Sequence, residues 1–254
     1  MYVFEEDGRS PFRMDEKTAQ LGMIMNFVDR LQAGRVLAAN LIDYWRRNDV
    51  VIFALPRGGV AVGAEVAAVL EDPLDVLIVR KVGLPDYPEM AIGAIASGGI
   101  ELISRKAVER FHVGAGDLHD VIAREQEEIN RQEKLFRGDN PFPEMAGRVA
   151  ILVDDGLATG HTMRAAIAAI RLHEPREIVV AVPVGAPATC RLLRRSVDRV
   201  VCLSAPRGFG AVGAYYQDFR PVGDDEVRQL LVRANKFAGG RFAAIEGPLV
   251  SEAS

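Results

Sequence analysis

Two adjacent aspartates, Asp154 and Asp155, directly follow a run of five apolar residues, VAILV at 149–153. The run is rich in β-branched residues and too short for an isolated helix, so it predicts a strand that is buried on both faces. Carboxylate oxygens at the end of such a strand can accept hydrogen bonds from the adjacent hydroxyls of a ribose. Because no basic partner stands beside the pair in the sequence, we expect it to bind a ligand rather than to stabilise the fold.

A loop of mostly small or hydroxyl-bearing residues follows the acidic pair. Apolar residues then recur at helical spacing from Met163, so the loop should open into a helix whose N-terminal N–H groups and positive dipole end point back at it. Such N–H groups and two threonine hydroxyls suit a terminal phosphate monoester. The candidate phosphate-binding residues are Gly156, Leu157, Ala158, Thr159, Gly160, His161 and Thr162.

A second strand and loop of the same kind precede the first. The apolar run at 50–55 ends at Pro56, Arg57, Gly58 and Gly59, and a helical pattern follows. The glycines let backbone N–H groups approach a ligand, and Arg57 can hold phosphate oxygens with a fork of donors. Taken alone, a tight turn with a solvated arginine is an equally good interpretation. Together with the loop after 149–153, the pattern favours a second anion site.

A third apolar segment, 75–80, predicts another strand of the same sheet. It places Arg80 and Lys81 at the carboxyl end, where ligands bind in parallel α/β sheets. Two cations at this edge indicate a polyphosphate, and a solvated strand end is the alternative.

The stretch VAILVDDGLATGHTM, residues 149–163, resembles the phosphoribosyl pyrophosphate (PRPP) motif of the type I phosphoribosyltransferases. The resemblance implies that the 5-phosphate binds the loop at 156–162 and that the ribose hydroxyls bind Asp154 and Asp155. It also implies that the loop at 56–59, which often carries an unusual cis peptide in this family, binds pyrophosphate.

The activity implied by this resemblance is transfer of the 5-phosphoribosyl group from PRPP to a nitrogen acceptor, with release of pyrophosphate. The acceptor would be a small, nucleobase-like molecule. Mg²⁺ would be held mainly by oxygens of PRPP, without a metal site made by the protein alone. The catalytic residues would be Arg57, Lys81, Asp154 and Asp155, with Gly58, Gly59 and Arg80 completing the pyrophosphate site.

One position departs from part of the family. The 6-oxopurine enzymes carry a further Asp immediately before the Thr-Gly of this loop, and here that position is Ala158. The departure argues against a hypoxanthine or guanine salvage role. His161 is also unusual, and both phosphate contact and exposure to solvent remain open for it.

A PRPP-binding regulatory protein without transferase activity is the alternative function. Regulators of this family carry a DNA-binding domain or a basic RNA-binding surface. Here no helix-turn-helix is evident before residue 27 and the net charge is −4, so we expect an enzyme and no nucleic-acid partner.

The pattern of segments predicts an α/β fold with a central parallel sheet of about five strands flanked by helices. The expected strands are 50–55, 75–80, 149–153, 177–184 and 198–203. The glycine- and proline-rich stretch 82–104 predicts a hairpin, and the resemblance implies a flexible two-stranded loop that closes over pyrophosphate. The resemblance also implies a small hood lobe to which 206–221 contributes. Its candidate acceptor-binding residues are Phe209, Tyr215 and Tyr216, for each of which simple packing is equally expected.

These elements divide the chain into an N-terminal extension (1–26), a phosphoribosyltransferase-like domain (27–236) and a C-terminal tail (237–254). No apolar run is long enough to span a bilayer, and the acidic N-terminus lacks a signal-peptide core, so we expect a cytoplasmic protein. Cys190 and Cys202 predict buried reduced thiols. We also expect a homodimer or a larger homo-oligomer.

Overall fold

A computed structural model describes residues 26–237 of the 254-residue chain. The predicted N-terminal extension and C-terminal tail therefore lie outside the described residues, apart from positions 26 and 237.

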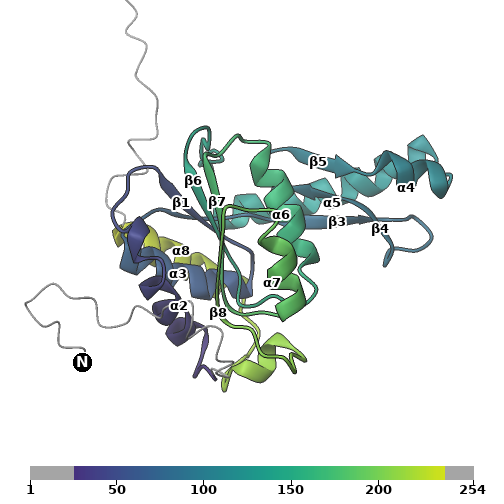
Figure 1. Ribbon diagram of the computed structural model, residues 1–254. Coiled ribbons are helices and arrows are strands. Elements are labelled where there is room, and N and C mark those ends of the chain that lie inside the picture. Colours follow the sequence, from purple (N-terminus) through teal and green to yellow (C-terminus); the bar gives the residue numbers. More distant parts are fainter. Residues whose placement is uncertain (1–25, 238–254) are drawn as a thin grey trace, which may run out of the picture.

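A five-stranded parallel sheet with the order β2-β1-β6-β7-β8 forms the centre of the structure (Figure 1). Its strands are β1 (Val50–Ala54), β2 (Leu74–Val76), β6 (Val149–Val153), β7 (Glu177–Val184) and β8 (Arg199–Ser204). The helices are α2 (Arg30–Ala39), α3 (Gly58–Leu70), α4 (Arg105–Arg110), α5 (Ala115–Phe136), α6 (His161–Arg171), α7 (Pro187–Leu193) and α8 (Asp224–Phe237). Short 3-10 helices are η1 (Ile42–Tyr44) and η2 (Val212–Tyr215). The predicted α/β fold is confirmed.

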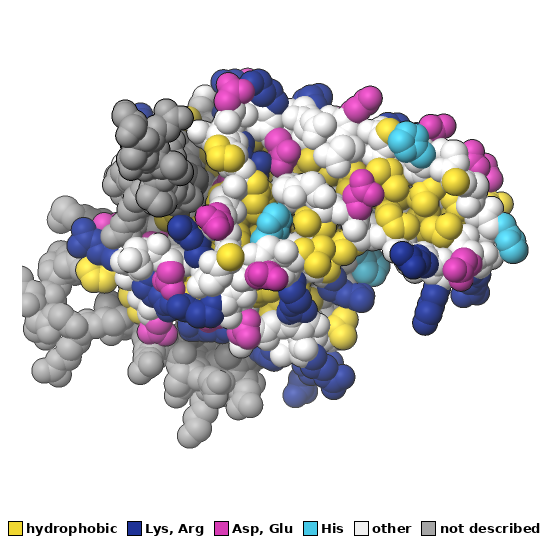
Figure 2. Space-filling model, turned by 90° about the horizontal axis from the view of Figure 1, so that it is seen from above, with side chains coloured by type: hydrophobic (Ala, Val, Ile, Leu, Met, Phe, Trp, Pro, Cys, Tyr) yellow, Lys and Arg dark blue, Asp and Glu magenta, His cyan; other side chains and the backbone are white. Residues whose placement is uncertain are grey.

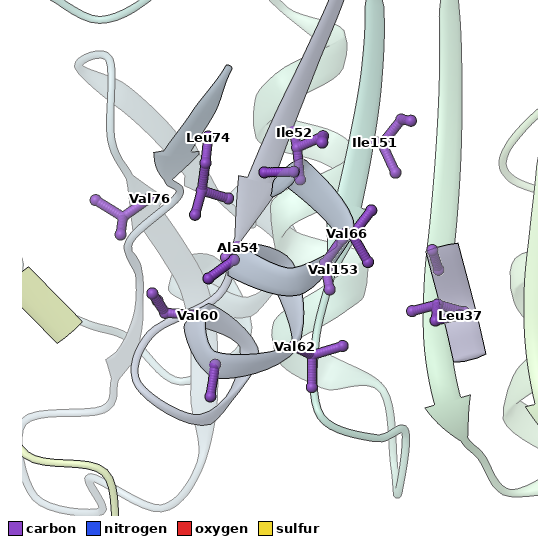
Figure 3. Packing of buried hydrophobic residues seen from close by; sticks show 14 of the residues in the cluster. Leu37, Ile52, Ala54, Val60, Val62, Val66, Leu74, Val76, Ile151 and Val153 are labelled. Carbon is purple, nitrogen blue, oxygen red and sulfur yellow. The ribbon is translucent and has the colours of Figure 1, made fainter. Parts of the chain in front are cut away.

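Alternate residues of the central strands face two separate cores, as the strand period of two requires. In β1, Ile52 and Ala54 pack with α2, α3 and α8, whereas Val51 and Phe53 pack with α6 and α7. Figure 3 shows the first of these cores, in which side chains of α3 lie against β1, β2 and β6. Helices thus cover both faces, and only the ends of the strands remain for binding.

The predicted strand at 75–80 is wrong in its extent, because the chain leaves the central sheet after Val76. The following strand, β3 (Val79–Gly83), belongs to a second, antiparallel sheet. Ser97 holds the chain between the two strands: its hydroxyl accepts from the N–H of Ile78 at 3.0 Å, and its N–H donates to the carbonyl of Ile78 at 2.9 Å.

The second sheet contains the predicted hairpin. Its strands β4 (Ala91–Ala96) and β5 (Ile100–Ile103) pair as expected, and β3 adds a third strand beside β4. Ile92 and Ile95 are buried, so this hairpin is packed against the domain along one strand. The connection between β3 and β4 is exposed at residues 85–90, which include Tyr87. Mobility of the segment remains a prediction.

The hairpin, α4 and α5 project from one side of the central sheet (Figure 1). Seen from above, apolar side chains gather on this projecting part (Figure 2), where Phe111 is 40% exposed. No helix in the described range 26–237 is both long and apolar enough to cross a membrane.

A buried ion pair fixes α5 to the end of β2. Nε of Arg137, which caps α5, donates to Oδ2 of Asp75 at 2.9 Å, and Nη2 donates to the carbonyl of Val76 at 2.9 Å. The side chains of Arg137 and Asp75 are only 8% and 7% exposed. Burial raises the pKa of Asp75 to about 6, although the charge of Arg137 opposes this rise. The position of α5 therefore depends on Arg137.

Replacing Arg137 with Met should destabilise the domain by about 3–5 kcal/mol at pH 8, because a buried carboxylate loses its partner. The folded-state pKa of Asp75 already lies above its ordinary value of 3.8, so Asp75 lowers stability as the pH rises from 3.8 through about 6. Without Arg137 this pKa rises further, so the destabilisation should be smaller at pH 5.

Urea unfolding at pH 5 and pH 8 measures this effect. Lys134→Met, which removes an exposed cation from the same helix, is the control and should change stability little. An equal loss for Arg137→Met at both pH values would contradict the prediction.

Candidate active site

The acidic pair lies at the carboxyl end of β6, near the middle of the central sheet. Asp154 and Asp155 are both half-buried. The N–H of Asp155 donates to Oδ1 of Asp154 at 2.9 Å, which orients the first carboxylate over the loop backbone. The pair thus occupies the edge where parallel sheets bind ligands.

Arg30, the first residue of α2, is a partner that sequence reasoning missed. Its Nε donates to Oδ2 of Asp155 at 2.8 Å, and its Nη1 donates to the carbonyl of Arg220 at 2.9 Å. Its guanidinium carbon lies 3.9 Å from the centroid of the Phe219 ring. Asp155 therefore has a basic partner in the fold although none stands near it in the sequence, and its role in ligand binding stays a prediction. Arg30 is 125 residues away in the sequence, so no local pattern indicates it.

The electrostatics of the pair favour a bound ligand. Burial raises the pKa of Asp154 well above its usual range, and the charge of Asp155 raises it further. Burial also raises the pKa of Asp155, but the hydrogen bond and charge of Arg30 oppose this rise. A ligand with hydroxyl donors, or a cation, would stabilise the two ionised carboxylates. It would offset the cost of their burial and their mutual repulsion.

The loop after β1 touches the acidic pair. The peptide bond between Pro56 and Arg57 is cis, and α3 begins at the next residue, Gly58. A Cβ at Gly58 would lie 2.8 Å from Cγ of Asp155, and one at Gly59 would lie 2.8 Å from a carbonyl oxygen of β6. Both distances are shorter than real Cβ contacts, so the two glycines permit the close approach of the two loops.

The small-residue loop after the acidic pair is anchored at Leu157, which is buried. The N–H of Leu157 donates to the carbonyl of Val184 at 2.9 Å, and its carbonyl accepts from the N–H of Ala186 at 2.7 Å. Thr189 donates its hydroxyl to the carbonyl of Ala158 at 2.6 Å. The inclusion of Leu157 among the phosphate ligands is corrected, because its N–H already donates to β7.

The rest of this loop is open. The backbone N–H groups of 158–162 have no hydrogen-bond partner within the described part of the chain. Gly160 has a φ of 71°, a left-handed conformation that glycine adopts without strain, and α6 begins at His161. Both threonines and His161 are exposed, whereas Gly156 is buried against Val212. The free N–H groups at the helix start can hold an anion.

A cavity of about 410 Å³ lies beside the loop after β1. Arg57, Arg80 and Thr162 all line it. The side chain of Arg57 is 56% exposed, and its Nη1 lies 3.4 Å from Oδ1 of Asp224, a long contact. Residues predicted from three separate segments therefore meet in one cavity.

Arg80 and Lys81 reach the site from β3 rather than from the central sheet. They line a neighbouring cavity of about 400 Å³, which also includes Thr162. Nε of Arg80 donates to Oε2 of Glu125 at 2.8 Å, and Nζ of Lys81 donates to the carbonyl of Glu89 at 3.3 Å. The second sheet thus supplies the cations that we assigned to the end of a core strand.

The aromatic segment of the predicted hood packs largely into the core. Tyr215 and Tyr216 are 8% and 6% exposed, and the hydroxyl of Tyr216 donates to the carbonyl of Asp155 at 2.6 Å. Of the two alternatives for these two rings, the structure favours core packing, because both rings are buried. Phe209 is half-buried, with its ring centroid 5.6 Å from that of Tyr215, and remains an acceptor candidate.

The arrangement suits a ligand with three different parts. It offers free N–H groups for a phosphate, carboxylates for hydroxyls, and guanidinium groups for a second anion. All three lie at the carboxyl edge of the central sheet or beside it.

Comparison with known sequences agrees with this geometry. The phosphoribosyl transferase domain family matches residues 23–218. The chain belongs to this family.

A protein of Mycobacterium tuberculosis (strain CDC 1551 / Oshkosh), named "Putative phosphoribosyl transferase MT0597", is 41% identical over 229 residues. The match covers 89% of this chain and 52% of that protein, so the chain spans about half the length of this relative. The crystal structure of TT1426 from Thermus thermophilus is similar with a TM-score of 0.72 and 40% identity, over 85% of this chain and 100% of that one. A "Bifunctional protein PyrR" from Brevibacillus brevis (strain 47 / JCM 6285 / NBRC 100599) is 32% identical over 112 residues, which cover 42% of this chain and 61% of that protein.

In this phosphoribosyl transferase domain, the two aspartates should affect stability to different extents. Asp154→Asn removes a buried charge and should raise the melting temperature at pH 8 by roughly 2–4 °C. Because the folded-state pKa of Asp154 is raised, its destabilising effect grows as the pH increases above 3.8, and the gain should shrink at pH 5. Asp155→Asn should raise the melting temperature less, because the loss of the charged partner of Arg30 offsets part of the gain.

Differential scanning calorimetry of both variants at pH 5 and pH 8 measures these shifts. A destabilised Asp154→Asn variant at pH 8 would show that this carboxylate has a structural role.

Proposed function

We propose that the protein is a phosphoribosyltransferase that uses PRPP and Mg²⁺ to transfer the 5-phosphoribosyl group to a nitrogen acceptor and releases pyrophosphate. The observation that carries the proposal is the contact between the two loops at Gly58 and Asp155. This contact makes one continuous surface from the N-terminus of α6 to the cavity beside Arg57, which suits a molecule with an anion at each end.

PRPP matches this surface group by group. Its 5-phosphate would bind the N–H groups of 158–162 with Thr159 and Thr162, and its ribose hydroxyls would bind Asp154 and Asp155. Its pyrophosphate would lie in the cavities. The pyrophosphate-binding residues would be Arg57, Gly58, Gly59, Arg80 and Lys81.

The chemistry requires stabilisation of a polyanionic leaving group. As the bond from the ribosyl carbon to pyrophosphate breaks, negative charge grows on pyrophosphate and positive charge grows on the sugar. Arg57 and Lys81 would stabilise the negative charge on pyrophosphate. The two carboxylates, which hold the ribose hydroxyls, would stabilise the positive charge on the sugar. Closure of the exposed loop around Tyr87 would exclude water, which otherwise competes with the acceptor for the ribosyl carbon.

The donor set fits Mg²⁺. Its main ligands would be oxygens of PRPP, the hard donors that it prefers, and the carboxylates of the acidic pair would add negative charge nearby. The described residues form no group of three or more His, Cys, Asp or Glu side chains that would hold the ion by themselves. When bound, Mg²⁺ supplies positive charge to the leaving pyrophosphate.

A PRPP-binding regulatory role is the second candidate. The similarity over 112 residues to a protein named bifunctional supports it, because that name is compatible with a second role beside catalysis. Transfer of the phosphoribosyl group distinguishes the two candidates, because only the transferase releases pyrophosphate from PRPP.

The test of the function is a screen of nucleobases and small amines with PRPP and Mg²⁺, scored by release of pyrophosphate. Release that depends on one acceptor, and that Asp154→Asn abolishes, is the expected result. Tight PRPP binding without turnover for any acceptor would favour the regulatory role, and absence of PRPP binding would contradict both.

Arg57 should distinguish the two ends of PRPP. Arg57→Ala should weaken PRPP and pyrophosphate binding by roughly ten- to a hundredfold, the value of a charge-assisted contact of about 1.5–3 kcal/mol. Binding of ribose 5-phosphate should be unchanged, because this molecule has no pyrophosphate. Calorimetry with the three ligands measures these affinities, and equal weakening for ribose 5-phosphate would mean that the pyrophosphate loop is placed wrongly.

A further inference from the structure

The cavity beside Arg57 has a wall that the proposed function leaves without a role. Three polar residues of α5, namely Glu128, Arg131 and Gln132, line it opposite the loop after β1. Glu128 lies about one helical turn before Arg131 and Gln132, so all three side chains are on the side of α5 that faces the cavity. Arg131 is thus a third guanidinium beside the same space as Arg57 and Arg80.

Arg131 is held by a carboxylate. Its Nε and Nη2 donate to the two oxygens of Glu128 at 2.8 and 2.9 Å, and Gln132 donates to the same carboxylate at 2.6 Å. These bonds lower the pKa of Glu128 to about 2, with the bond from Arg131 as the larger cause. Glu128 is therefore charged at neutral pH and competes with any anion for Arg131.

The position of Arg131 is not that of an arbitrary surface residue. The buried pair of Arg137 and Asp75 fixes the C-terminal end of α5 to the edge of the central sheet. Arg131 lies less than two helical turns before Arg137, so its backbone is fixed relative to the loop after β1. Only its side chain has to move to meet a ligand, and that side chain is 56% exposed.

We propose that Arg131 binds the pyrophosphate end of the substrate and that Glu128 holds Arg131 until this anion arrives. The proposal rests on the proposed function, because it places a further ligand in the same cavity. Anion binding replaces the bond between Arg131 and Glu128 by a bond between Arg131 and phosphate oxygens. The bidentate fork of Arg131 fits either partner.

Two substitutions should have opposite effects on pyrophosphate affinity. Arg131→Gln should weaken pyrophosphate and PRPP binding by about three- to tenfold, less than Arg57→Ala, because Arg131 must first leave Glu128. Glu128→Gln should strengthen pyrophosphate binding by about two- to fivefold, because it removes the competing charge. Neither should change binding of ribose 5-phosphate.

Isothermal titration calorimetry with pyrophosphate, PRPP and ribose 5-phosphate tests this, with Mg²⁺ in every experiment. The matched control is Lys134→Gln, which removes one positive charge from the same helix but lies outside both cavities. It should leave all three affinities unchanged, which separates a local contact from a general effect of net charge.

The outcomes separate this inference from the proposed function. Opposite shifts for the two variants, with an unaffected control, support it. Unchanged pyrophosphate affinity in Arg131→Gln, while Arg57→Ala loses affinity, overturns the role of Arg131 and leaves the proposed function intact. A wild-type protein that binds neither PRPP nor pyrophosphate overturns both. Weaker binding in Glu128→Gln would show that this carboxylate supports the site rather than competing in it.

Discussion

The parallel pairing of β1 with β6 is the constraint on which the site depends. Ala54 lies opposite Val153 in this register, so the two strands end together and their loops begin at the same height. Each loop then enters a helix, α3 or α6. The loops can touch only because Gly58 has no side chain. Two helix starts are thereby held side by side, which neither strand could achieve alone.

The acidic loop is also the point to which distant segments attach. Arg30 binds the side chain of Asp155 from α2, and Tyr216 binds its backbone carbonyl from the predicted hood segment. Phe219 packs against Arg30 and stacks with Tyr216. The hood segment therefore supports the proposed ribose site through Asp155, and its aromatic residues serve packing more than contact with an acceptor.

The sequence predicts the features that depend on local pattern. Apolar runs ending in glycine-rich loops identify β1 and β6, and the helical period identifies α5. It does not predict features that depend on long-range contact. Arg30 is 125 residues from Asp155, and Ser97, which accepts from the N–H of Ile78 between β2 and β3, is 19 residues from it. Arg131 resembles an ordinary surface arginine until α5 is placed against the loop after β1. Its position beside the cavity requires the whole fold.

We infer that one PRPP molecule bridges the two loops in a single orientation. A crystal structure of the protein with PRPP and Mg²⁺ tests it most directly. We expect the 5-phosphate at the N–H groups of 158–162, the ribose hydroxyls at Asp154 and Asp155, and the pyrophosphate beside Arg57 and Arg80. PRPP bound in the reverse orientation, or with its pyrophosphate outside the cavity beside Arg57, would contradict the account.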